Sequence, residues 1–323
     1  MLTDRPSTKR LQLCYAAVPL LISFIISITA FFAAVFIRGF YYHTNISEEA
    51  AADDGIVYLI NYMLQIIIFG FWYITQRKQQ EELSSENESE KIKKASADKR
   101  QAKTAKETSE DKGPAKAANK TSVIKADSNV GKDRKTVTKA WNPVAYWAKR
   151  LPLLIVLGFA LQYAVSGIIA VLSAAFPSAF SAYRELIQSL AGNDVDWLTF
   201  IAVSFLAPIG EELCFRGVTL NYARKGMPIR WAILFQAVLF GIYHLNVVQF
   251  FYAVIVGYLL GMLADQAGSV VPCIVLHMII NLSAYLVPSV FLDNIPKAAF
   301  TAALAIVVAI PCCILLLKKP RKR

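Results

Sequence analysis

The sequence is short of charge, of histidine and of paired cysteines. Only 18% of its 323 residues are charged, three are histidine and 56% are hydrophobic, and the mean hydropathy is +0.44. This composition excludes an ordinary soluble enzyme, because a soluble globule of this size needs more charge on its surface. The five cysteines lie in apolar runs without C-x-x-C spacing, which argues against a disulfide framework or a zinc ribbon.

The charge that is present is concentrated in one stretch. Residues 77–140 hold 17 of the 34 basic and 11 of the 23 acidic residues, with almost no large apolar side chains. Such a segment cannot bury a core, so we expect a disordered cytoplasmic linker. Its interleaved acids argue against a nucleic-acid-binding arm. The linker would separate an N-terminal two-span hairpin, residues 1–76, from a six-span bundle, residues 141–323.

Long apolar runs make up most of the remaining chain, and runs of roughly 17 to 25 residues are typical of transmembrane helices. There are eight candidates: 11–37, 56–75, 151–176, 197–220, 231–248, 250–264, 270–287 and 298–317. Residues 179–190 have the spacing of a short helix on the outer surface. Basic flanking residues predict cytoplasmic N- and C-termini. The sequence therefore predicts an all-α, polytopic bundle of about eight spans in a membrane, which we expect to be a prokaryotic cell membrane.

A few polar side chains interrupt these runs, and such residues are costly in lipid, so each is a functional hypothesis. They are Glu211, Glu212 and Arg216 in the fourth run, His244 in the fifth, and His277 and Asn281 in the seventh. Glu212 and Arg216 are four residues apart, which predicts a supporting ion pair on one helix face. Glu211, turned about 100° away, is left as the candidate base. Counting the helical rise from the cytoplasmic ends places the cluster in one layer.

This set of side chains suits the hydrolysis of a peptide bond. Glu211 would accept a proton from water, His244 would hold that water, and His277 with Asn281 would donate to the oxyanion. We expect Phe240 to pack against the site. Glu211, His244 and His277 could instead bind zinc, but no H-E-x-x-H pattern is present, so metal catalysis is placed second.

Simpler interpretations exist for each residue taken alone. A buried ion pair or an interhelical hydrogen bond would account for the individual polar groups without any chemistry. A proton-coupled transporter could use the same residues as a relay, although no internal repeat supports it. The site is favoured because the groups share one depth.

Three motifs in order carry a family resemblance: E-E-L-C-F-R at 211–216, F-G-I-Y-H at 240–244 and H-M-I-I-N at 277–281. They resemble the EExxxR, FxxxH and HxxxN patterns of the CPBP family, also called Abi, over about residues 197–285. The resemblance implies an intramembrane glutamate-type endopeptidase like the type II CAAX prenyl proteases, without a cofactor and with the roles assigned above.

The resemblance also implies partners. The expected substrate is a peptide or protein at the membrane, which could be lipidated, with the site open to the cytoplasm and surrounded by membrane lipids. No nucleic acid is expected. The family also includes bacteriocin self-immunity proteins, so a non-proteolytic immunity or scaffold protein is the alternative function.

Overall fold

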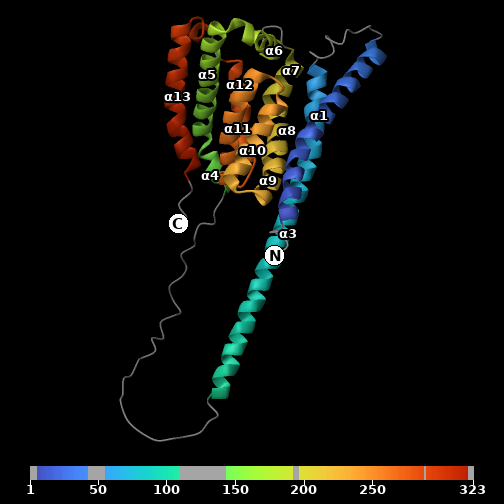
Figure 1. Cartoon of the computed structure of the whole chain (residues 1–323), viewed down its shortest axis with the longest axis vertical. Helices are drawn as coiled ribbons and strands as arrows, with labels where there is room; N and C mark the ends of the chain where they lie inside the picture. Colours follow the sequence, from blue (N-terminus) through green and yellow to red (C-terminus); the bar gives the residue numbers. More distant parts are fainter. Residues whose placement is uncertain (1–5, 43–54, 110–142, 192–195, 287–288, 319–323) are drawn as a thin grey trace. The chain divides into compact units, whose positions relative to one another are not determined.

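The computed structural model describes residues 6–42, 55–109, 143–191, 196–286 and 289–318, and the regular elements in these ranges are helices. The α-helices are α1 (Pro6–Tyr42), α3 (Gly55–Ser109), α4 (Pro143–Ala148), α5 (Leu151–Ala175), α6 (Ser181–Ala191), α7 (Trp197–Ile201), α8 (Ala207–Glu212), α9 (Leu220–Gly226), α10 (Ile229–Tyr243), α11 (Val247–Ala267), α12 (Val271–Ala284) and α13 (Ile295–Leu317) (Figure 1). The predicted all-α class is confirmed for the described residues.

The eight apolar runs all fall on helices. Six of these helices are long and apolar enough to cross a membrane, with the fourth formed jointly by α7, α8 and α9 over Trp197–Gly226. The other two, α10 and α12, have only 15 and 14 residues, or roughly 22 Å at the helical rise. The chain is thus a multi-pass membrane protein.

The boundary between the fifth and sixth runs differs from the prediction. We expected the break at Gln249, whereas α10 ends at Tyr243 and α11 begins at Val247. Leu245 takes a left-handed conformation with φ of 52°, and the Asn246 side chain accepts a hydrogen bond from the Gln249 backbone N–H. Asn246 therefore caps α11. Because apolar residues continue through the turn, the hydropathy of the sequence did not reveal it.

The structure also differs from the disordered linker expected over 77–140. Residues 77–109 continue α3 as a helix, whose side chains over 77–97 are exposed, and residues 110–140 lie outside the described ranges. Lys, Glu, Gln and Ala are strong helix formers that need no buried face. Pairs at i, i+4 add a little stability, such as Lys94 with Glu90 at 3.1 Å. From Thr75 onward this helix belongs to a separate compact unit.

The membrane bundle is held by close backbone contacts between helices. Helix α5 packs along α13 and α12, α10 packs along α11, and α1 packs along α9. A Cβ added at Gly167 of α5 would lie 2.6 Å from the Ala298 carbonyl oxygen of α13. Small residues at such crossings let helices approach closely in lipid, where dispersion contacts replace the hydrophobic effect.

Helix α6 is the short amphipathic helix predicted over 179–190. Tyr183, Leu186 and Ile187 are half-buried on one face, whereas Arg184 and Glu185 are exposed on the other. This spacing of three and four residues is the period of a helix lying on a surface. The prediction of a short helix between the third and fourth spans is confirmed.

Candidate active site

The fourth span is an irregular helix, and its irregularity lies around the acidic pair. Wider π-helical turns, Ala202–Leu206 and Leu213–Thr219, flank α8 on either side. Pro208, which lacks a backbone N–H, lies in the first turn of α8. Glu211 and Glu212 end α8 and are buried, with 5% and 0% exposure. Such π-helical turns often occur at functional sites because they redirect side chains.

Glu212 forms the centre of a buried polar cluster. Its Oε1 atom accepts a hydrogen bond from Arg216 Nη1 at 2.8 Å and lies 2.8 Å from His277 Nδ1. The Arg216 guanidinium also stacks 4.3 Å above the Phe240 ring and donates to the Gly257 carbonyl at 3.3 Å. The predicted pair on one helix face is therefore present, and it extends to His277.

His277 lies between the two glutamates. Its Nδ1 contacts Glu212, while its Nε2 lies 3.8 Å from Glu211 Oε2. Because a carboxylate paired with arginine accepts hydrogen bonds only, the contact assigns a proton to Nδ1. Its Nε2 then faces the Glu211 side of the site.

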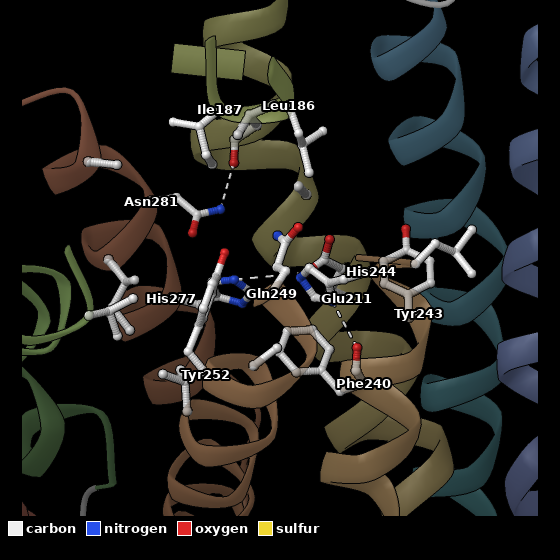
Figure 2. Close-up of a pocket in the computed structure, with 18 of the residues that line it drawn as sticks. Leu186, Ile187, Glu211, Phe240, Tyr243, His244, Gln249, Tyr252, His277 and Asn281 are labelled. Carbon is white, nitrogen blue, oxygen red and sulfur yellow. Dashed lines mark hydrogen bonds and ion pairs between the residues drawn. The ribbon is translucent and has the colours of Figure 1, made fainter. Parts of the chain in front are cut away.

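His244 directly follows the last residue of α10 as its C-cap, and its ring is fixed from two sides. Nδ1 lies 2.8 Å from the Phe240 carbonyl oxygen, which can only accept, so Nδ1 donates and Nε2 is left as an acceptor. The Phe240 ring meets His244 edge-on at 4.7 Å and His277 edge-on at 5.9 Å between centroids. Phe240 thus packs between the two histidines (Figure 2).

Asn281 lies one turn after His277 on α12, but its amide has a different partner. Its Nδ2 donates to the Val203 carbonyl at 2.9 Å, in the first π-helical turn. We expected His277 and Asn281 to donate towards one point. The structure commits one amide hydrogen of Asn281 to the backbone, which leaves its second hydrogen for a ligand.

A cavity of about 420 Å³ joins the candidate residues. Glu211, His244, His277 and Asn281 all line it, so the structure brings together side chains from three separate spans. Figure 2 shows these side chains with Leu186 and Ile187 of α6 beside them. Glu212 and Arg216 are buried behind this lining.

Sequence reasoning missed the contribution of α3. The Tyr62 hydroxyl is a hydrogen-bond partner of Glu211 and also of Tyr243. Gln65 donates to the Tyr243 hydroxyl at 2.9 Å and to Asn61 Oδ1 at 3.3 Å. Charged groups, the histidines and Asn281 marked the predicted site, whereas other amides and tyrosines at i and i+4 in an apolar run carry the same kind of signal.

The alternative zinc ligands do not form a ready set. Among the residues that the structure describes, no three His, Cys, Asp or Glu side chains gather as a metal site. His277 Nδ1 is held by Glu212 and His244 Nδ1 by a carbonyl, which leaves one nitrogen, Nε2, of each ring for a further partner.

A match found among known protein families covers the part of the chain that contains the three motifs of this site. The comparisons with curated proteins and with solved structures gave no match. One family model matches residues 193–283, a range that holds all three motifs and excludes α1, α3 and α5. Over residues 193–283 the chain is similar to the family described as Type II CAAX prenyl endopeptidase Rce1-like, and this similarity supports a membrane peptidase.

Proposed function

We propose that the chain hydrolyses a peptide bond of a membrane-associated protein with a water molecule activated by Glu211 and His244. The observation that carries this proposal is that the two neighbouring glutamates have different partners. Glu212 is taken up by Arg216 and His277, whereas Glu211 lines the cavity together with both histidines and Asn281. A carboxylate left over from charge pairing in a buried cavity is placed to act as a base.

Glu211 and His244 would share the attacking water. Glu211 accepts a proton from it, and His244 Nε2, the nitrogen that the Phe240 carbonyl does not engage, accepts a hydrogen bond from its second proton. The oxygen then adds to the substrate carbonyl carbon, and the proton on Glu211 passes to the leaving amine. Such general base catalysis contributes about 10²- to 10⁴-fold in rate.

His277 and Asn281 would stabilise the tetrahedral oxyanion. Asn281 Nδ2 has a second hydrogen besides the one bound to Val203. His277 donates from Nε2 when both of its nitrogens carry protons, and the Glu212 carboxylate at Nδ1 supplies the balancing charge. Removing one oxyanion donor costs about 10²- to 10³-fold in kcat in comparable sites. The proposed mechanism uses no cofactor.

The proposal is tested with the purified full-length protein and a library of prenylated and unprenylated peptides. Glu211→Gln should abolish cleavage, because the amide cannot accept the proton. Glu185→Gln is the matched control, since Glu185 is exposed on the polar face of α6, and it should cleave like wild type. Equal cleavage by both variants would refute the proposal. The cleaved members of the library would show whether the substrate is lipidated.

A further inference from the structure

We infer that the cavity is reached from the non-cytoplasmic side of the membrane, so that the scissile bond of the substrate lies on that side. The inference about the substrate rests on the proposed function, whereas the inference about the cavity does not. The inference about the cavity follows from two observations: which end of each helix lines the cavity, and which end of each helix carries basic residues.

One end of the bundle is basic, and contacts tie its members together. Arg224 in the last turn of the fourth span pairs with Asp265 near the end of α11, at 2.7 Å. Arg150 before α5 donates to the Leu315 carbonyl near the end of α13, at 2.7 Å. Exposed Lys225 and Arg230 flank the turn between α9 and α10. Short loops rich in Lys and Arg face the cytoplasm, so this is the cytoplasmic end.

The cavity is lined from the opposite ends of the same helices. Along its own helix, His244 lies 14 residues beyond Arg230, and Gln249 lies 16 residues from Asp265. At the helical rise these separations are about 21 and 24 Å, in a hydrocarbon layer of about 30 Å. The cavity therefore lies in the outer half of the bundle.

The elements around the cavity lie at the end of the bundle opposite the basic residues. Figure 1 shows α6 and α7 at one end of the bundle, and α4 and α9 at the other. Helix α6 places Leu186 and Ile187 in the cavity lining. Leu245, the lining residue next to His244, is 79% exposed, so the cavity reaches the surface beside the catalytic histidine. Asp196 and Asp293, with Asp293 paired to Lys297, flank the spans at this end.

This geometry selects a class of substrate. A protein whose lipidated C-terminus remains in the cytoplasm would have to carry its cleavage site across about 20 Å of the membrane to meet His244. A protein anchored in the membrane, with the susceptible segment just outside its anchor, would meet the cavity directly. The inference reverses the cytoplasmic opening that the family resemblance led us to expect.

The side of the membrane from which the cavity is reached can be tested without any substrate. The test uses the full chain carrying Cys14→Ala, which removes the exposed native thiol. Leu245→Cys marks the cavity rim, and Lys225→Cys, exposed at the basic end, is the matched control. A membrane-impermeant maleimide applied to intact cells should label the rim variant at least tenfold faster, with the control labelled only after permeabilisation. Labelling of the control from outside, with the rim protected, would overturn the inference.

The substrate class is tested with a single-pass membrane reporter that carries a library of cleavage segments directly outside or directly inside its anchor. Cleavage restricted to the outer segments and lost in Glu211→Gln supports the inference, whereas cleavage restricted to the inner segments overturns it. If the rim is labelled from outside but neither reporter is cut, the assigned side of the cavity holds and both the substrate class and the proposed protease activity are refuted.

Discussion

Replacing Tyr62 with phenylalanine removes one hydroxyl from the cavity and leaves the ring in place. This hydroxyl is a hydrogen-bond partner of Glu211 from a helix outside the matched family segment. A hydrogen bond to a charged group contributes about 1.5 to 3 kcal/mol. If Tyr62 orients Glu211 for proton transfer, the loss falls on the transition state, and kcat should decrease roughly 10- to 150-fold.

The control is Tyr222→Phe. The Tyr222 hydroxyl also links α3 to the fourth span, because it accepts a hydrogen bond from Trp72 Nε1 at 3.3 Å, but it does not line the cavity. Both variants should lose stability, by about 1 kcal/mol for the neutral hydrogen bond of Tyr222 and by about 1.5 to 3 kcal/mol for the hydrogen bond of Tyr62 to a charged group. Only Tyr62→Phe should lose activity.

Initial rates over a range of substrate concentrations separate kcat from KM, and thermal unfolding in the same detergent reports stability. A positioning role predicts a lower kcat with KM nearly unchanged for Tyr62→Phe. Wild-type kcat in this variant, or an equal decrease in Tyr222→Phe, would refute the reasoning, because a purely structural hydroxyl affects both variants alike.

Three further predictions concern stability. Arg216→Met leaves its buried carboxylate partner without a balancing charge and should cost about 3 to 5 kcal/mol, read as a lower unfolding temperature; an unchanged temperature would contradict the ion pair. Gly167→Ala places a Cβ 2.6 Å from the Ala298 carbonyl and should cost about 1 to 3 kcal/mol, whereas a stabilised variant would refute this packing. Burial alone would raise the pKa of Asp196, but hydrogen bonds from the Thr199 hydroxyl and from backbone N–H groups outweigh it and lower the pKa. Its stabilisation is therefore full at neutral pH and lost as the pH falls through that lowered pKa, so the unfolding temperatures of wild type and Asp196→Ala should converge in acid, and a gap that widens in acid would contradict the prediction.

The helices of the membrane bundle were predictable because lipid leaves few alternatives. A run such as 151–176 has one stable form across a bilayer, and hydropathy finds it directly. The turn at Leu245 and Asn246 was missed because its neighbours remain apolar, and only the capping asparagine marked it. The helix over 77–109 was missed because the absence of a core argues against tertiary packing, and we took it to argue against a helix as well.

The candidate site was predictable where it contains charged side chains, because such side chains are costly to bury in an apolar run. Glu211, Glu212 and Arg216 were conspicuous in an apolar run, and helix geometry alone separated the paired carboxylate from the other. Tyr62 was not predictable in this way, because tyrosine is common in membrane helices and its contact with Glu211 depends on how α3 packs. The π-helical turn Ala202–Leu206, which places Val203 near Asn281, depends on packing in the same way.

We propose that Glu211 activates the attacking water without a metal ion. The most direct test is the ratio of the initial cleavage rates of Glu211→Gln and wild type, both measured after treatment with a strong chelator. Chelated wild type should retain its full rate, and Glu211→Gln should be slower by at least about 10²-fold. Loss of the wild-type rate on chelation, restored by zinc, or a variant that cleaves as fast as wild type, would contradict this proposal.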